Sequence, residues 1–188
     1  MNAFRSSLIT TLICLVLTSF VVADQPKLPS PPEGFTWQWS EEAKVAILQP
    51  TNWHFKTDVK KETQGIFVTK EEIDPQKGFE TGLTLNAIPN ISKTAKMKAS
   101  EYAKKFVGEA TRDKSKVLEV LPQKKAGPAE TCGCRIKKDG SVTHFFLIAD
   151  DKNDKLYLFF FESPEKEWDE AWKLGEQMMK KLYIDFPE

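Results

Sequence analysis

The stretch HFFLIA at residues 144–149, followed after a short acidic loop by LYLFFF at residues 156–161, decides the fold of this chain. Neither run alternates between apolar and polar side chains, as a strand with one solvent-exposed face does. We therefore predict two neighbouring strands in the middle of a sheet, each covered by other elements on both faces.

The rest of the strand pattern is read outward from these two runs. Apolar segments bounded by turn residues predict further strands at residues 35–40, 45–48, 66–69, 81–88, 117–121 and 130–137. Asp139-Gly140 predicts a two-residue hairpin turn that leads into residues 142–149. Residues 52–64 are interpreted as a loop or an irregular strand, and Pro122 is expected to end the strand before it.

Two helices are predicted. The first lies between residues 92 and 110, where apolar side chains recur at helical spacing, with Ser92 or Ser100 as its N-cap. The second follows Ser163, a natural N-cap, and Pro164, and extends to Leu182. Its buried stripe includes Trp168 and Trp172, which would anchor it to the sheet.

The beginning of the chain has the pattern of an export signal. In residues 1–23, Arg5 precedes an apolar run that ends at a small-residue cleavage site, and this run is shorter than the roughly 20 residues needed to cross a bilayer. We predict cleavage after Ala23, export to the periplasm or the extracellular space, and no stable membrane insertion afterwards. Retention as an uncleaved anchor is the alternative. Clustered prolines predict an extended tether at residues 24–34, followed by a single domain at residues 35–188.

The charge of the chain is balanced, with 27 basic and 27 acidic residues. A neutral chain has no general attraction for nucleic acid or for anionic lipid, so we predict no nucleic-acid partner. A local group of lysines could meet a charged partner, but it is interpreted as a solvated helix face: Lys93, Lys96, Lys98, Lys104 and Lys105.

Four short motifs are informative together: PEGF at residues 32–35, LQP at 48–50 with Trp53 after it, TGLTLN at 81–86, and FESP at 161–164 leading to Trp168. They resemble the PsbP-like family, which is named for the lumenal extrinsic subunit of photosystem II and shares its fold with a small Ran-binding nuclear protein. The resemblance implies an α+β fold, in which a mostly antiparallel β-sheet is sandwiched between helices. It also implies a non-enzymatic role in binding protein partners or assisting assembly, with no cofactor and no catalytic residues to carry over.

Cys132-Gly133-Cys134 contains the two thiols that remain after signal removal. An even number of cysteines in an exported protein favours a disulfide, and in a strand both side chains point to the same face. A disulfide in so small a ring would be strained and easily reduced. A structural disulfide or inert buried thiols, a redox pair, and a site for a soft metal ion such as Cu(I) or for zinc are the open alternatives.

Other residues that suggest chemistry have simpler interpretations. Counting from the hairpin turn places Cys134 nearer Phe145 than His144, so a catalytic Cys–His dyad is not expected. The acidic loop at residues 150–154 lacks the spacing of a calcium-binding loop and is interpreted as a solvated hairpin. Three tryptophans could form a carbohydrate or hydrophobic-ligand site, but core packing is favoured for each: Trp37, Trp39 and Trp53.

The sequence supports two functional hypotheses. The first is an exported, non-enzymatic binding or assembly module that engages a protein partner outside the cytoplasm. The second is a thiol-based redox or metal-binding protein that uses the Cys132-Gly133-Cys134 pair. No catalytic, cofactor-binding or metal-ligating residue is assigned under the first hypothesis.

Overall fold

A computed structural model describes residues 26–186, so the predicted signal peptide at residues 1–23 lies outside the described residues. In the described part the elements follow in the order β1 (Phe35–Ser40), β2 (Val45–Pro50), β3 (His54–Lys60), β4 (Thr63–Thr69), β5 (Gly82–Pro89), α1 (Ile91–Ala95), α2 (Ala99–Ala110), β6 (Val117–Ala126), β7 (Ala129–Lys138), β8 (Ser141–Asp150), β9 (Lys155–Pro164), α3 (Trp168–Lys180) and β10 (Tyr183–Ile184). Short 3-10 turns precede β6 (Lys114–Lys116) and α3 (Glu165–Glu167). No helix within residues 26–186 is both long enough and apolar enough to cross a membrane.

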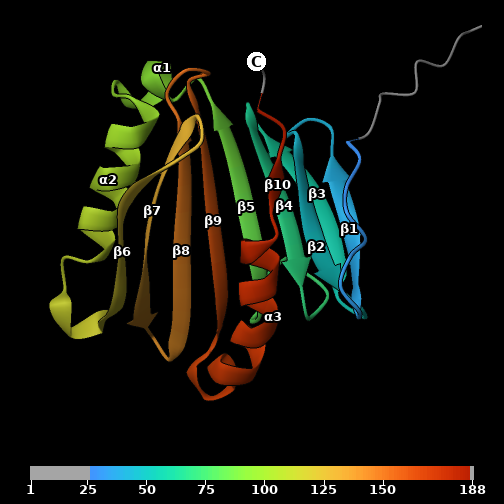
Figure 1. Cartoon of the computed structure of the whole chain (residues 1–188). Helices are drawn as coiled ribbons and strands as arrows, with labels where there is room; N and C mark the ends of the chain where they lie inside the picture. The colour runs from blue at the N-terminus through green and yellow to red at the C-terminus, as the bar shows by residue number, and fades with distance from the viewer. Residues whose placement is uncertain (1–25, 187–188) are drawn as a thin grey trace, which may run out of the picture.

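The strands form two antiparallel sheets. The larger has the order β3-β4-β5-β9-β8-β7-β6, and the smaller has the order β1-β2-β10. Helices α1 and α2 lie on one face of the larger sheet, while α3 and the smaller sheet lie on the other (Figure 1). The predicted α+β sandwich is confirmed, and β8 and β9 are internal strands as the two apolar runs indicated.

Two separate cores show why these runs have no polar alternation. On the α3 face, Phe159 and Phe161 are fully buried in the larger core, which also includes side chains of the smaller sheet. On the α2 face, Leu147 and Leu156 are fully buried against α1 and α2. Successive residues of a strand point to opposite faces, so a strand with a core on each side must be apolar throughout.

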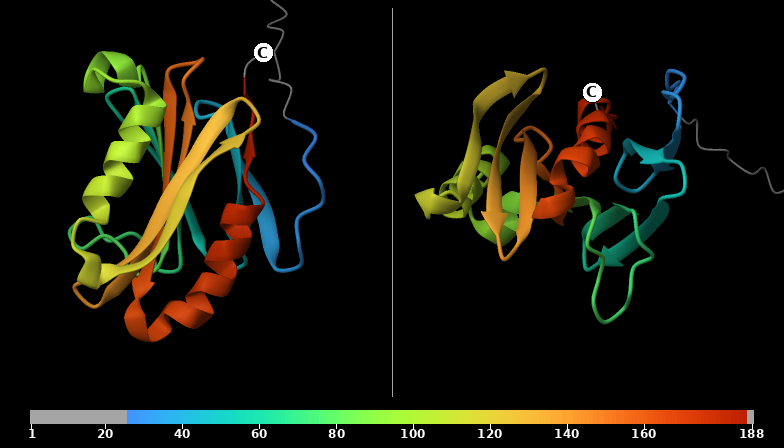
Figure 2. Two further views of the ribbon diagram at one scale, coloured as in Figure 1. Left: turned by 60° about the vertical axis from the view of Figure 1, so that its left-hand side comes forward. Right: turned by 90° about the horizontal axis from the view of Figure 1, so that it is seen from below.

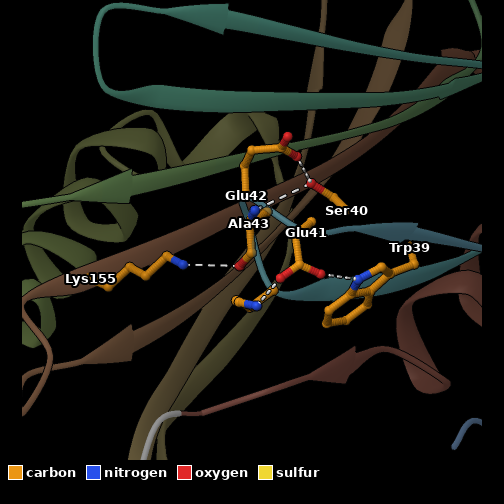
Figure 3. Close-up of polar contacts among 7 residues, drawn as sticks. Trp39, Ser40, Glu41, Glu42, Ala43 and Lys155 are labelled. Carbon is orange, nitrogen blue, oxygen red and sulfur yellow. Dashed lines mark hydrogen bonds and ion pairs between the residues drawn. The ribbon is translucent and has the colours of Figure 1, made fainter. Parts of the chain in front are cut away.

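The C-terminal segment connects the two sheets. After α3 the chain forms β10, which pairs with β2 and thereby adds a third strand to the smaller sheet (Figure 2). A second connection is Lys155 of β9, whose Nζ donates to the carbonyl oxygen of Ala43 at 2.9 Å (Figure 3). The same turn is closed by the Ser40 hydroxyl, which accepts from the Ala43 amide at 3.2 Å. Burial lowers the pKa of Lys155, and the nearby Asp150 carboxylate opposes that shift.

The acidic loop between β8 and β9 binds the N-terminal turns of both neighbouring helices. Asp154 accepts from the Ser92 amide at 2.8 Å and from its hydroxyl at 2.6 Å. Asp151 accepts from the Ser100 amide and hydroxyl at the same two distances. Each carboxylate satisfies an amide that has no partner within its helix and lies at the positive end of the helix dipole.

Several local predictions are wrong at their boundaries. The helix predicted between residues 92 and 110 is two helices, and neither Ser92 nor Ser100 is an N-cap, because both lie inside the first turn. Residues 52–64 contain the regular strand β3. Ser163 is not an N-cap either, because β9 continues through Pro164 by pairing with Ser141.

Pro122 does not end β6, which continues to Ala126. It lies at a register shift between Leu121 and Lys124, on a strand at the edge of the sheet. A proline is tolerated there because its missing N–H costs no hydrogen bond to a further strand.

Helix α3 approaches the sheet closely at Gly175. A Cβ atom at this position would lie 2.8 Å from ring carbons of Phe161. We expect Gly175→Ala to lower the free energy of unfolding by about 1–3 kcal/mol, because the helix would have to move away from a fully packed core. Urea unfolding measures this change.

Gly108 in α2 is the matched control, since a Cβ atom there would have no neighbour within 4 Å. Gly108→Ala is expected to raise the free energy of unfolding by about 0.5–1 kcal/mol through helix propensity alone. A Gly175→Ala variant as stable as Gly108→Ala would contradict the close approach of α3 to Phe161.

Candidate functional site

A pocket of about 430 Å³ opens between α3 and the strands β6, β7 and β8, and we refer to it as the α3 pocket. It combines apolar walls with two acidic and two basic side chains and one imidazole. Its lining residues are Glu119, Leu121, Arg135, His144, Phe146, Trp172, Glu176, Met179 and Lys180.

Strand register brings the polar groups of the α3 pocket together. Arg135 of β7 pairs directly with His144 of β8, so both side chains point to the α3 face. Glu119 of β6 pairs with Arg135 on the other side, which extends the row across three strands. From α3, Trp172 and Glu176 are four residues apart and therefore project from the same side of the helix.

The Trp172 ring is the centre of a stack of flat groups. Its centroid lies 5.2 Å from that of Trp168, with 11° between the ring planes. The guanidinium carbon of Arg135 lies 4.6 Å from the Trp172 centroid and 5.3 Å from that of Trp168. The His144 ring also packs on Trp172, at 4.5 Å between centroids. A guanidinium over indole rings adds about 0.5–2 kcal/mol, more where water is excluded.

His144 is a buried, uncharged imidazole. Only 6% of the residue is exposed. Burial, and to a smaller extent the positive charge of Arg135, lower the pKa of His144 from its ordinary value of 6.5 to about 4, and Glu176 opposes the shift. At neutral pH the imidazole is therefore neutral, so Arg135 and Lys180 provide the positive charge of the pocket.

The hydrogen-bonding capacity of the pocket is only partly used. Within residues 26–186, the Nε of Arg135 and the Nδ1 of His144 are buried and have no hydrogen-bond partner. The ion pair between Arg135 and Glu119 is long, at 3.4 Å, whereas Lys180 and Glu176 lie 3.0 Å apart. A buried donor without an acceptor is costly, so the geometry favours binding of a group that brings an acceptor to Arg135.

The cysteine pair lies on the opposite face of the sheet from the α3 pocket. Cys132 and Cys134 are buried beneath α2 as free thiols. Burial raises the pKa of each thiol to about 11, with a smaller contribution from Glu130 at Cys132 and from Cys132 at Cys134. The thiol form therefore dominates at neutral pH, whereas nucleophilic attack and metal binding both require the thiolate. The disulfide between them stays a prediction.

The register also settles the relation between the cysteines and His144. Cys134 pairs with Phe145, as counting from the hairpin turn predicted, and His144 pairs with Arg135. Gly133 lies between the two cysteines because β7 and β8 approach closely there, and a side chain would collide with the Phe145 carbonyl. Strand parity therefore puts the Cys134 and His144 side chains on opposite faces of the sheet.

The tryptophans and lysines that the sequence suggested as binding residues lie where packing or solvent exposure explains them. Trp37 and Trp53 pack partly buried against the larger core, which confirms the core interpretation for both. Trp37 also donates from Nε1 to the Pro29 carbonyl at 2.7 Å, and Trp39 donates to Glu41 at 2.8 Å. The five lysines of the predicted solvated face are all exposed. No group of three His, Cys, Asp or Glu side chains among residues 26–186 is placed to hold a metal ion.

Sequence reasoning missed the grouping of Arg135 and Glu119 with Trp172. The turn at Asp139-Gly140 predicted which residues of β7 and β8 face each other, but nothing in the sequence fixes where α3 crosses them. One local signal was present, an arginine between the apolar residues Cys134 and Ile136.

The fold places this chain among α+β sandwiches with one large antiparallel sheet. Among solved structures it is similar to cyanobacterial PsbP (CyanoP) from Synechocystis sp. PCC 6803, with 12% identity over 84% of this chain and 99% of that one and a TM-score of 0.53. It is also similar to the Ran-binding protein Mog1p of Saccharomyces cerevisiae, with 11% identity over 80% of this chain and 95% of that one and a TM-score of 0.46. The chain therefore has the PsbP-like fold that the four motifs indicated.

No family model matches the chain, and no curated protein matches it in sequence.

Proposed function

We propose that this protein is an exported, non-enzymatic binding module that engages a protein partner outside the cytoplasm. One observation carries the proposal: the edge strand β6 exposes two large apolar side chains. Leu118 is 54% exposed and Val120 is 50% exposed. Large apolar side chains grouped on a surface are typical of interaction sites.

The edge position of β6 suggests the form of the contact. An edge strand has peptide groups without a partner strand, and an extended segment of another protein can pair with them. The second half of β6 contains Pro122, Lys124 and Lys125, which are features that protect an edge against such pairing. The first half contains Leu118 and Val120, so we place the contact there.

The PsbP-like fold is compatible with this proposal but does not identify the partner, because one fold serves many functions. The proposal rests on the surface of this chain. The β3 edge offers a comparison, since it exposes Val59 (60% exposed) among Lys56, Asp58 and Lys60. Charged side chains of this kind discourage strand addition, so the β6 edge is the better candidate.

Photo-crosslinking, combined with substitutions that introduce charge on β6, tests the proposed contact between β6 and a partner. The mature protein would carry a photoreactive amino acid at Lys116, which is exposed directly before β6, and extracts of the exported compartment would be cross-linked. We expect a discrete partner to be captured, and capture to fall at least about tenfold when Leu118→Asp and Val120→Asp are combined, since charges replace buried apolar contacts. Val59→Asp at the opposite edge is the matched control and should capture as much as the unaltered protein.

Equal capture by the double variant and by Val59→Asp would overturn the β6 contact. Circular dichroism and urea unfolding of both variants show whether they remain folded, and both positions are exposed, so small changes in stability are expected.

Export is tested separately. N-terminal sequencing of the protein isolated from its own cells should begin at Asp24 if the signal is cleaved after Ala23. A chain that begins at Met1 and stays in the cytoplasm would contradict export, and one that begins at Met1 in the membrane fraction would support the uncleaved anchor.

A further inference from the structure

We propose that the α3 pocket binds a carboxylate carried on an aromatic or branched apolar group, with Arg135 as the residue that pairs with the carboxylate. This inference goes beyond the β6 contact, because it concerns a cavity on one face of the sheet rather than the edge of the sheet.

The state of Arg135 is the first argument. Its side chain is only 21% exposed, yet its one ion pair is 3.4 Å long, and its Nε has no hydrogen-bond partner among the described residues. The guanidinium carbon lies over the Trp168 and Trp172 rings, at 5.3 and 4.6 Å from their centroids, and these cation–π contacts hold the group in place. Such contacts take up no N–H donor, and a carboxylate can accept two parallel hydrogen bonds from a guanidinium.

The walls of the pocket are the second argument. Leu121, Phe146, Trp172 and Met179 surround the remaining space, and the volume of about 430 Å³ is in the range of small-molecule sites. A charged group without an apolar body would leave these side chains in contact with water. The pocket therefore favours a ligand in which one carboxylate is attached to a compact apolar group.

Glu119 is the third argument, because it already shows where a carboxylate approaches Arg135. It lies on β6 directly across from Arg135, and its side chain is 43% exposed. The ion pair is long and its carboxylate is open to solvent, so it contributes little to stability and Glu119 can turn into the solvent when a ligand enters. The other carboxylate of the pocket, Glu176, is paired with Lys180 at 3.0 Å and leaves Arg135 to the ligand.

Two sources can supply this chemistry, a free aromatic carboxylic acid and the C-terminal carboxylate of a peptide that ends in an aromatic residue. The shared group is the carboxylate, and the probes separate the sources. Phenylacetate represents the free acid and phenylacetamide its neutral control. The peptide Gly-Gly-Phe with a free carboxyl terminus represents the peptide source, and its amidated form is the control.

Binding would be measured by isothermal titration calorimetry and by ligand-observed NMR on the mature protein at millimolar probe concentrations. We expect phenylacetate or Gly-Gly-Phe to bind and the matching amide to bind at least about tenfold more weakly, since a hydrogen-bonded charge is lost. If only phenylacetate binds, the source is a free acid. Tighter binding of Gly-Gly-Phe assigns the source to a chain terminus.

Three variants connect binding to the named residues. Arg135→Gln should weaken binding at least about tenfold, because it removes the charged partner of the carboxylate. Glu119→Gln should tighten binding about two- to fivefold, because the competing carboxylate is removed while its shape is kept. Lys173→Gln, in an exposed α3 ion pair with Glu170 outside the α3 pocket, is the matched charge control and should change affinity by less than about twofold.

Glu119→Gln keeps the test decisive if Arg135→Gln does not fold. Unchanged or weaker binding by Glu119→Gln, equal binding of acid and amide, or no binding of either carboxylate would each overturn the inference. These results are independent of capture through Leu118 and Val120, so the failure of one proposal leaves the other standing.

Discussion

Replacing Phe161 by Ala is expected to lower the free energy of unfolding by about 3–5 kcal/mol, a change typical of a fully buried aromatic side chain. Phe161 has no exposed surface and packs against three tryptophans, with ring centroids 6.5, 5.9 and 5.7 Å from Trp53, Trp168 and Trp172. The cavity would lie directly beneath α3, so helix and sheet would both lose contacts. Thermal unfolding should shift downward by about 10 °C.

Phe160→Ala is the matched control on the same strand. Phe160 points to the α2 face, is partly exposed, and pairs with Phe145 at 5.9 Å between centroids. We expect a clearly smaller loss, because part of this side chain is already in contact with water. If the two variants were equally destabilised, α3 would not be packed on Phe161 as described.

Acidification from pH 6.5 to pH 4 is expected to destabilise the protein by about 3 kcal/mol through His144 alone. Burial first, and then Arg135, lower the pKa of His144 from 6.5 to about 4 in the folded state. Between these values the unfolded chain binds a proton at this residue and the folded protein does not. Stability therefore rises with pH through this window, reaches its full value above pH 6.5, and is lost as pH falls toward 4.

His144→Gln should flatten this dependence, because the side chain no longer titrates. The chain has one other histidine, His54, which is exposed on the edge strand β3 and provides the control. His54→Gln should retain the pH dependence of the unaltered protein. Burial raises the pKa of Glu162, which acts with the opposite sign, so the slope is best compared between variants by urea unfolding at several pH values. Equal slopes in the two variants would contradict a buried neutral His144.

The arrangement of the sheet could be predicted from the sequence, because the composition of a strand shows whether one or both of its faces are covered by other elements. Runs such as residues 144–149 and 156–161 have no polar face, and the hairpin turn at Asp139-Gly140 fixes which residues pair. Helix boundaries were less predictable. Ser92 and Ser100 have the chemistry of N-caps, but their amides are bound by carboxylates from another part of the chain.

The candidate site was only half predictable. Strand parity placed Cys134 beside Phe145 and away from His144, and the helical stripe predicted that Trp168 and Trp172 pack on the sheet, where Trp168 is buried and Trp172 partly buried. The contact between Trp172 and His144 depends on where α3 crosses β7 and β8. That position is set by packing details such as the missing side chain of Gly175, which has no local signature in the sequence.

The hairpin that carries Asp151 and Asp154 has a consequence for engineering the chain. Surface hairpins of a few residues are usually the safest places to insert a tag or to open a circular permutant. Here the two carboxylates must reach two helices at once, so their spacing is constrained from both sides. Lengthening this loop by one residue should disturb the contacts of Asp151 and Asp154 with α1 and α2 and lower stability, whereas the β6–β7 turn should accept added residues.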